Sequence, residues 1–331
     1  MSVVERLDRF QRRHTIVAFP IAVAYKFADD MGPQLAAMIT YYGFVSLFPL
    51  LLLFVSILGF FLHGNQELQN RLVSSALADF PLLRTELRHN ISSFSGSGVG
   101  IAVGLLGAMY GGLGMTQAAQ AAFNRVYGVP RNERPNPVTS RLRSLLLLLL
   151  LGIGVLITTG LSALTTSAGI FGPGIAAWVR GIASILSFGA NVGLFLAAFH
   201  VLVARRLRFR EVAIGGLIAG GAWQLLQTLG IYYLAHHLKY ASDVYGVFGF
   251  VLGLLAWIYL EAAALVFSAE INVVLHRRLW PRALATPFTD DVDLTGPDKR
   301  AYASYAASER YKGFQRVGVS FLRRRRRRRS G

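Results

Sequence analysis

The segment from Val244 to Arg278 constrains the fold of this chain more than any other. It reads VYGVFGFVLGLLAWIYLEAAALVFSAEINVVLHRR, and its only acidic residues are Glu261 and Glu270. A helix of this length would extend about 50 Å, whereas the hydrocarbon core of a bilayer is about 30 Å thick. The segment is therefore predicted to cross a membrane, with Glu261 near the midplane and Glu270 closer to one interface.

The distribution of charge along the chain excludes an ordinary soluble domain. Only 15% of the residues are charged and 53% are hydrophobic, whereas soluble domains average about 25% charged residues. Long uncharged runs alternate with short charged loops. This pattern predicts an all-α membrane protein that crosses the bilayer several times. The absence of cysteine excludes disulfides, thiol catalysis and cysteine-bound zinc.

Six apolar stretches are predicted to cross the bilayer as helices. They lie at about 34–62, 98–122, 144–166, 181–204, 212–235 and 244–278. Together they predict a six-helix transmembrane domain over residues 33–280. Residues 1–32 are predicted to be a cytoplasmic N-terminus with an amphipathic helix at the membrane surface. Residues 281–331 are predicted to be a disordered basic tail, whose removal should leave folding intact.

The positions of lysine and arginine orient the predicted helices. Of the 34 Lys and Arg residues, 29 lie in the N-terminus, the 123–143 loop, the 205–210 turn and the C-terminal tail. Because basic loops stay on the cytoplasmic side, both termini are predicted to be cytoplasmic. The tail ends in seven arginines, which are expected to bind anionic lipid headgroups, with nucleic acid as the less favoured partner. They are Arg323, Arg324, Arg325, Arg326, Arg327, Arg328 and Arg329.

Small residues mark the expected helix-packing faces. In the second span, glycines alternate at spacings of four and three, so one face of the helix lacks side chains and a neighbouring helix can approach closely. These are Gly100, Gly104, Gly107, Gly111 and Gly114. Gly216 and Gly220 have similar spacing in the fifth span. In the first span, Pro49 removes a backbone hydrogen bond and is expected to kink or break the helix.

Polar residues within the spans are the candidate functional residues. Glu261 and Glu270 lie nine residues apart, about 180° around a helix, so they are expected to face different neighbours. Carboxylates at such depth are costly and often functional. Glu261 is interpreted either as a proton or cation site or as a hydrogen-bonding residue between helices. Glu270 is interpreted either as a residue that serves the cytoplasmic end of such a site or, with preference, as one that reaches interfacial water or arginines. The polar residues that could complete such a site are Gln117, Gln224, Gln227 and Asn272.

Three motifs stand out along the chain. They are YYGFVSLFP, which ends at Pro49, FNRVYGVP at 123–130, and the ordered set YGVFG, WIYL and AEIN across 245–272. In these motifs the chain resembles the YihY/BrkB family over about residues 20–280. The resemblance implies a six-helix protein of the bacterial inner membrane. Members of that family have been linked to envelope integrity, serum resistance or lipid export, and older records gave the family the name ribonuclease BN.

The residues of the chain favour transport over catalysis. No GxSxG, HExxH or phosphate-loop motif occurs, and the acidic cluster Asp290, Asp291 and Asp293 lies in the predicted tail. We therefore expect no enzymatic activity, cofactor or metal site. The leading hypothesis is transport or flipping of an envelope lipid or amphiphile, because broken helices and midplane polar groups build many transporter sites. The alternatives are a non-catalytic scaffold for envelope integrity and, disfavoured, a ribonuclease.

Overall fold

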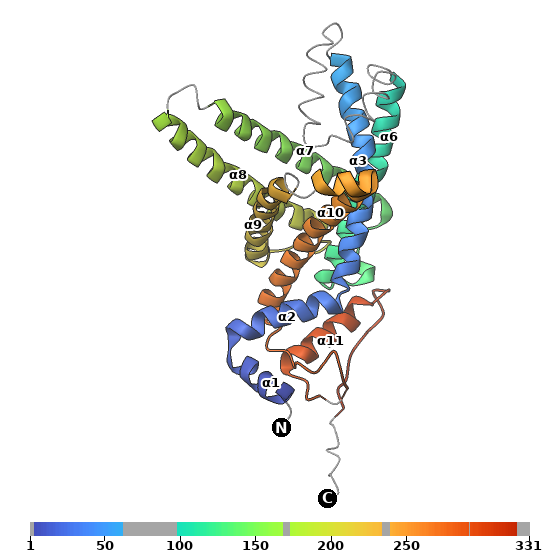
Figure 1. The fold of residues 1–331 in the computed structure, drawn as a ribbon. Coiled ribbons are helices and arrows are strands. Elements are labelled where there is room, and N and C mark those ends of the chain that lie inside the picture. The colour runs from blue at the N-terminus through green and yellow to red at the C-terminus, as the bar shows by residue number, and fades with distance from the viewer. Residues whose placement is uncertain (1–2, 62–97, 168–172, 234–238, 291, 323–331) are drawn as a thin grey trace, which may run out of the picture.

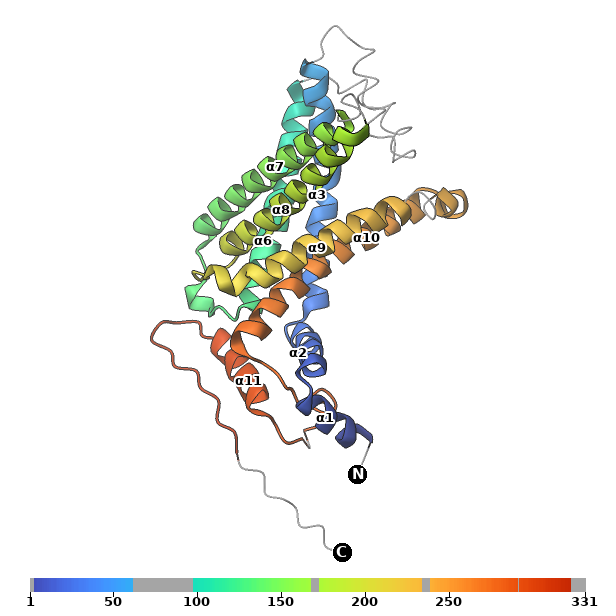
Figure 2. The same ribbon diagram turned by 90° about the vertical axis from the view of Figure 1, so that its left-hand side faces the viewer.

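The protein is built from pairs of long helices. The computed structural model describes residues 3–61, 98–167, 173–233, 239–290 and 292–322, and within these ranges the chain forms helices and connecting segments with no strand. The long helices pair as α3 (Gly32–Phe61) with α6 (Gly98–Val126), α7 (Pro137–Ser167) with α8 (Pro173–Leu202), and α9 (Phe209–Tyr233) with α10 (Lys239–Arg277). The pairs diverge from one shared end, near which α1 (Val3–Arg13) and α11 (Gly296–Ser308) lie (Figure 1, Figure 2).

The lengths and composition of these helices confirm the predicted all-α membrane architecture. Among the described residues, five helical segments are long and apolar enough to cross a membrane. They are Ile101–Val126, Pro137–Gly154, Ala177–Leu202, Phe209–Leu229 and Val251–Arg277. The first predicted span corresponds to α3, which is not among these five. The count of six spans and the cytoplasmic orientation of the termini stay predictions.

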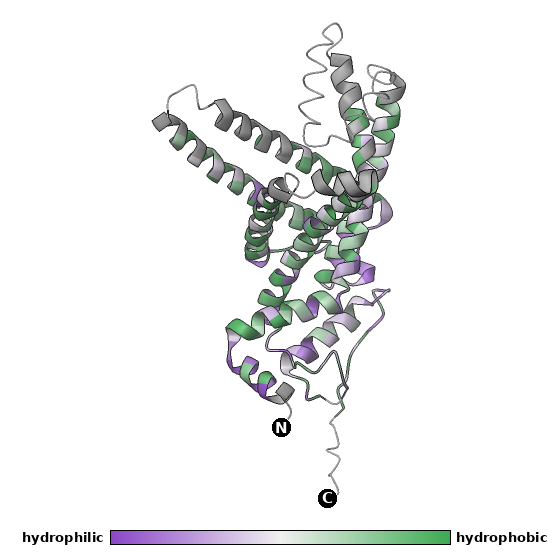
Figure 3. Ribbon diagram, viewed as in Figure 1, coloured by the Kyte–Doolittle hydropathy of each residue, from purple (hydrophilic) through white to green (hydrophobic). Residues whose placement is uncertain are grey.

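The most buried part of the protein lies where the three helix pairs meet. Phe123 of α6 and Phe199 of α8 are fully buried, with their ring centroids 5.1 Å apart, and Val212 of α9 and Val266 of α10 are also fully buried. We call this shared end of the helix pairs, together with α1 (Val3–Arg13), α2 (Thr15–Asp29) and α11 (Gly296–Ser308), the base. Hydrophilic residues gather in the base, whereas the diverging helices are mainly apolar (Figure 3). Exposed apolar side chains such as Leu106 are therefore suited to contact lipid.

The segment predicted to form the N-terminal amphipathic helix is helical, as α2, and its place at the membrane surface stays a prediction. One face of this helix, Ala18, Ala22, Val23 and Lys26, is buried, and α2 packs against α10. Ile16 on another face is exposed. The helix thus covers part of α10 as well as presenting an apolar surface outward.

The glycine strip of α6 packs against α3, as its spacing predicts. A Cβ atom added at Gly104 would lie 2.9 Å from Leu53 Cα, and one added at Gly111 would lie 2.5 Å from Ser46 Cα. Real Cβ atoms do not approach backbone so closely, so the two helices can be this close only because α6 lacks side chains there. Gly114 likewise abuts Tyr42. Gly100 lies in the first turn of α6, and its packing lies outside the described contacts.

Pro49 does not break the first span. Helix α3 continues through it from Gly32 to Phe61, and a Cβ added at Gly107 would lie 2.7 Å from Pro49 Cβ. Spanning helices tolerate the loss of one backbone hydrogen bond where a neighbouring helix supports the segment. Pro49 therefore serves as a packing residue against α6.

The C-terminal segment differs from the prediction of a disordered tail. Helix α11 begins at a capping box, in which Thr295 accepts a hydrogen bond from Asp298 N and Asp298 accepts one from Thr295 N. Such reciprocal bonds satisfy backbone donors that a helix start leaves unpaired. Arg282 and Asp298 are buried as well. The polar composition of 281–322 concealed this local helix signal, and the arginines from Arg323 to Arg329 lie outside the described residues.

Candidate functional site

The FNRVYGVP motif ends helix α6 with a defined turn. Val129 N donates to Asn124 O over 2.8 Å, and Gly128 N donates to Arg125 O over 2.9 Å. These two bonds form a Schellman motif, which needs a left-handed residue after the helix, and Gly128 has φ +59°. The turn leaves Tyr127 O free to accept from Arg277 Nη2 over 2.6 Å. The end of α6 is thereby tied to the end of α10.

A buried ion-pair cluster joins three helices of the base. Lys26 Nζ of α2 lies 2.9 Å from Glu270 Oε2 of α10 and pairs with Asp30 just after α2. The same ammonium donates to Val126 O of α6 over 3.0 Å. Lys26 and Asp30 are buried, and Glu270 is 0% exposed. We call Lys26, Asp30 and Glu270 the Lys26 cluster.

The Lys26 side chain is held in its charged form. Burial by itself would lower the pKa of Lys26, but the attraction of Glu270 and Asp30 outweighs burial, so the pKa of Lys26 is raised. Both Glu270 oxygens are buried without a hydrogen bond of normal geometry. The ion pair with Lys26 is therefore the main compensation for burying the Glu270 carboxylate.

Asn272 fastens α9 and α6 to α10. Its Oδ1 accepts from Gly215 N over 2.6 Å, and its Nδ2 donates to Tyr127 OH over 3.2 Å. Gly215 allows this contact, since a Cβ there would collide with the Asn272 amide. The AEIN and FNRVYGVP motifs, which are far apart in the sequence, therefore meet in the base. Their polar side chains bind backbone and each other.

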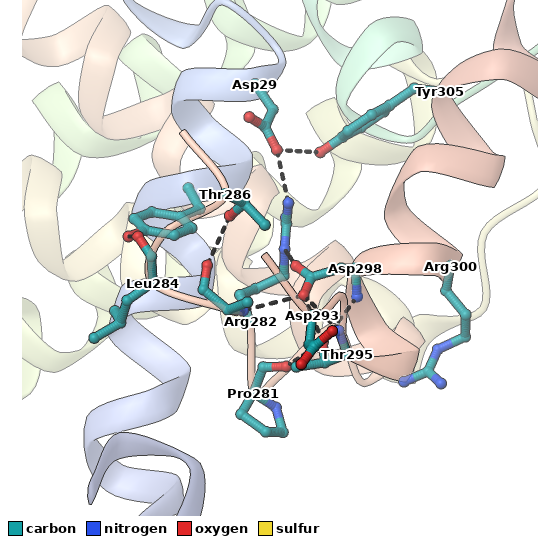
Figure 4. Close-up of polar contacts among 12 residues, drawn as sticks. Asp29, Pro281, Arg282, Leu284, Thr286, Asp293, Thr295, Asp298, Arg300 and Tyr305 are labelled. Carbon is teal, nitrogen blue, oxygen red and sulfur yellow. Dashed lines mark hydrogen bonds and ion pairs between the residues drawn. The ribbon is translucent and has the colours of Figure 1, made fainter. Parts of the chain in front are cut away.

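A second cluster, in which Arg282 and Asp298 are buried and Asp29 is exposed, attaches the C-terminal segment to the N-terminal helices. Arg282 Nε lies 2.5 Å from Asp298 Oδ1, and Arg282 Nη2 lies 3.0 Å from Asp29 Oδ2. Tyr305 OH donates to the same Asp29 oxygen over 3.2 Å. Figure 4 shows the Arg282 guanidinium between these two carboxylates. Burial and nearby carboxylates raise the pKa of Tyr305, so its hydroxyl remains a donor.

The structure does not bring all of the predicted intramembrane polar residues together. Glu261 is half-buried, and its Oε1 accepts from Trp257 Nε1 of the same helix over 3.0 Å. The side chains of Gln117, Gln224 and Gln227 are exposed. Glu270 and Asn272 instead lie in the base.

Sequence reasoning did not find the partners of these two residues. Glu270 was expected to reach water or arginines, but it is buried and pairs with a lysine. Lys26 carried a signal, because it is the only charged residue in the apolar run 15–28. Asp30, Arg277 and Arg282 gave no comparable signal, since charged residues next to helix ends are usually exposed.

A polar pocket of about 450 Å³ lies in the base next to the Lys26 cluster. It is formed by the end of α2, the start of α3, the end of α6, the loop after α6 and the end of α11. Its lining residues are Asp29, Asp30, Leu35, Ala121, Arg125, Arg131, Arg134, Tyr305, Ala306, Ser308 and Glu309. We call it the base pocket.

An apolar groove of about 490 Å³ lies between α3 and α10. It is lined by Ala37, Thr40, Tyr41, Leu255, Ala256, Tyr259 and Leu260. The Thr40 hydroxyl donates to Ala36 O within its own helix, so the groove offers mainly hydrocarbon and two tyrosine rings. We call it the α3–α10 groove.

The described residues hold no group of three or more His, Asp or Glu side chains placed to bind a metal ion. Of the acidic cluster near the C-terminus, Asp290 and Asp293 are described and Asp291 is not. The backbone oxygen of Asp293 accepts a hydrogen bond from Arg12 Nη2. The described part of the chain thus offers binding surfaces but no recognisable metal centre.

Comparison with known protein families identifies the chain. The family described as Virulence factor BrkB matches residues 23–290. This range contains Lys26, Glu270, Asn272 and the complete FNRVYGVP turn. The chain belongs to the BrkB family. Helix α11, which supplies one wall of the base pocket, lies beyond the matched range.

Other members of this BrkB family are also membrane proteins. The chain is 26% identical to the inner membrane protein YhjD of Escherichia coli, over 81% of this chain and 83% of that protein. It is 27% identical to a UPF0761 membrane protein of Alkalilimnicola ehrlichii, over 83% of this chain and 62% of that protein. With its apolar helices, the chain is a multi-pass protein of the inner membrane.

One relative of this BrkB-family chain is named after a nuclease and not as a membrane protein. The ribonuclease-like protein YfkH of Bacillus subtilis is 22% identical over 75% of this chain and 91% of its own length. No solved structure matches the chain.

Proposed function

We propose that this BrkB-family protein transports or flips a membrane amphiphile, such as an envelope lipid. The α3–α10 groove is the observation that carries the proposal. Its volume of about 490 Å³ falls within the range of about 300–1,000 Å³ that is typical of small-molecule sites. Its lining suits an acyl chain, because burying hydrocarbon against hydrocarbon leaves no polar group unpaired.

The position of the groove along α10 suits an amphiphile that crosses the bilayer. Residues 255–260 of α10 line the groove and belong to the candidate span Val251–Arg277. An acyl chain could therefore enter sideways from the membrane. The tyrosine hydroxyls of Tyr41 and Tyr259 can meet the polar part of the same molecule. A groove of this kind would lower the cost of moving an amphiphile past the α3–α10 contact.

We propose Glu261 as the proton- or cation-binding residue of this transport. It follows the lining residue Leu260 directly, and its described partner is the neutral indole of Trp257. The variant Glu261→Gln keeps the shape but loses the charge, so transport should fail while protein yield stays normal. If Glu261 serves only as a hydrogen-bonding residue, Glu261→Gln should be active, whereas Glu261→Leu should reduce yield.

Filling the groove tests the transport proposal. Ala256→Trp should slow the movement of a fluorescent phospholipid between leaflets of proteoliposomes, because the indole occupies the space of an acyl chain. The control is Leu252→Trp, which places the same ring on an exposed position of α10 outside the groove lining. Equal rates for wild type, variant and empty vesicles would reject lipid movement by this protein.

A non-catalytic scaffold is the second candidate function. The observation that favours it is the base, in which buried ion pairs tie the N-terminal, C-terminal and spanning helices together. Buried polar networks of this kind favour one fixed arrangement. A scaffold would restore envelope integrity in a null strain even when the Ala256→Trp variant blocks the groove.

A ribonuclease remains the disfavoured alternative. Metal-dependent hydrolysis requires side chains that hold a cation near an attacking water, and the part of the chain that the structure describes offers no such group of side chains. RNA that stays intact with the purified protein and added Mg²⁺ or Mn²⁺ would agree with this view.

We propose that the arginine run at the C-terminus binds the anionic membrane surface. Each basic residue near such a surface contributes about 1 kcal/mol. A synthetic peptide of residues 309–331 should bind vesicles that contain phosphatidylglycerol and dissociate as salt concentration rises. Preference for RNA over these vesicles at equal salt would favour the nucleic-acid alternative.

A further inference from the structure

The base pocket contains two arginine side chains that no carboxylate of the described residues pairs directly. Its lining includes three arginines and three carboxylates, which are Arg125, Arg131, Arg134, Asp29, Asp30 and Glu309. Equal numbers suggest a neutral pocket at first sight. The pairing of each carboxylate shows which arginines of the pocket are left without a direct partner.

Each carboxylate of the pocket is already paired with a cation. Asp29 shares Arg282 with Asp298, and Asp30 shares Lys26 with Glu270, and neither of these cations lines the pocket. Glu309 Oε2 lies 2.7 Å from Arg131 Nε. The hydrogen bond from Arg131 holds the pKa of Glu309 below its usual value. Glu309 therefore remains an anion paired with Arg131 at neutral pH.

Arg125 and Arg134 have no carboxylate partner among the described residues. Arg134 Nε donates to Val129 O over 3.2 Å, which leaves its two terminal nitrogens available. Burial lowers the pKa of Arg134, and the nearby Arg131 and Arg125 lower it further, with Glu309 acting in the opposite direction. Arg125 and Arg134 are thus the guanidinium groups of the pocket that no carboxylate of the described residues pairs directly.

We propose that the base pocket binds a phosphate group through Arg125 and Arg134. A phosphate oxygen pair matches the fork of a guanidinium, and arginine binds phosphate in this bidentate way more readily than lysine does. The volume of about 450 Å³ leaves room for a substituent on the phosphate. The ligand class is therefore a phosphate ester, either a lipid headgroup or a soluble molecule.

The depth of the pocket favours access from the membrane surface. Arg125 lies in the last turn of the candidate span Ile101–Val126, and Leu35 lies in the first turns of α3. Lipid phosphates lie at the ends of spanning helices, so Arg125 is at headgroup height. Arg131 and Glu309 stand at the exposed side of the same pocket, where a soluble phosphate could enter. This proposal does not depend on lipid movement through the α3–α10 groove.

The test measures stabilisation of the full chain by two probes. The detergent-purified protein is heated with increasing inorganic phosphate, against chloride at equal ionic strength. In parallel, it is heated in phosphatidylcholine nanodiscs with or without phosphatidic acid. A gain with inorganic phosphate assigns a soluble ligand, a gain only with phosphatidic acid assigns a lipid headgroup, and no gain with either overturns the proposal.

Matched variants decide whether the pocket is responsible. Arg125→Gln combined with Arg134→Gln should weaken binding of the effective probe at least about tenfold, because charged hydrogen bonds are lost. Arg206→Gln combined with Arg208→Gln removes the same charge at exposed positions outside the pocket and should bind normally. Equal weakening in the two double variants would show nonspecific attraction and overturn the proposal.

A third variant covers the case in which the arginine substitutions disturb folding. Ala121→Phe fills the pocket from an exposed position on α6 and leaves every charge in place. It should abolish stabilisation by the effective probe at normal yield. Normal binding by Ala121→Phe would place the phosphate elsewhere and overturn the proposal.

Discussion

Lys26 and Glu270 lie 2.9 Å apart in the buried base and join α2 to α10. Because Lys26 also pairs with Asp30, one cation compensates two buried carboxylates. The cluster therefore depends on Lys26 more than on either acid. This asymmetry makes the contributions of the residues separable by mutation.

We expect Lys26→Met to destabilise the protein more than Glu270→Gln. The first change leaves Glu270 and Asp30 buried without a cation, a situation that costs about 3–5 kcal/mol. The second leaves Lys26 paired with Asp30 and bonded to Val126 O, and should cost about 1–3 kcal/mol. The thermal unfolding midpoint of each detergent-purified variant measures the difference. Equal midpoints would contradict the central role of Lys26.

The raised pKa of Lys26 predicts a loss of stability at alkaline pH. A raised folded-state pKa contributes stability that is complete below the unfolded value, about 10.4, and is lost as pH rises through the folded value. The contribution of Lys26 to stability should therefore be constant around neutral pH, and the unfolding midpoint should decline above about pH 10. In Glu270→Gln the decline should begin at the same pH but be smaller and end at lower pH, because one attraction that raises the folded-state pKa of Lys26 is absent. An equal loss of stability over this pH range in both proteins would argue against this linkage.

The glycine strip predicts that even one methyl group disrupts the α3–α6 contact. Gly111→Ala should reduce membrane yield and the unfolding midpoint, because its Cβ would meet Ser46 backbone at 2.5 Å. Gly152→Ala is the matched control, since nothing lies within 4 Å of a Cβ there. The control should be stabilising by about 0.5–1 kcal/mol, as alanine favours a helix interior. Similar behaviour of the two variants would mean that α3 and α6 are not closely packed.

Two truncations separate the C-terminal segment from the arginine run. Deleting residues 281–331 removes Arg282 and Asp298, leaves Asp29 without its cation, and should lower yield and thermal stability. Deleting only 323–331 should leave both unchanged, because the buried contacts of α11 remain. This expectation replaces the one from sequence that the whole tail is dispensable. A normal unfolding midpoint after the longer deletion would contradict the buried role of Arg282.

Reporter fusions test the predicted topology. Fusions after Gly64, Gly172 and Ala241 should report the outside, and fusions after Asn132, Arg208 and Gly331 should report the cytoplasm, because the basic segments favour the inner side. Paired reporters, one active on each side of the membrane, provide the measurement and the internal control. A single reproducible reversal would exclude six spans with cytoplasmic termini.

The sequence by itself determined the membrane-spanning helical architecture and one packing face. Hydrophobic length and the segregation of charge depend only on local composition, so they locate the helices before any contact is known. The strip from Gly104 to Gly114 also indicated that a neighbouring helix can approach closely, because missing side chains have the same meaning in any partner helix, and the structure shows that this helix is α3.

Only the tertiary structure decided which polar residues meet. Lys26 and Glu270 are separated by most of the chain, and no periodic pattern pairs two charges over such a distance. Arg282 and Asp298 were hidden for a related reason, because local composition reports polarity but not burial. The partners of a buried charge are set by how helices from distant parts of the chain pack at the base, and that packing appears only in three dimensions.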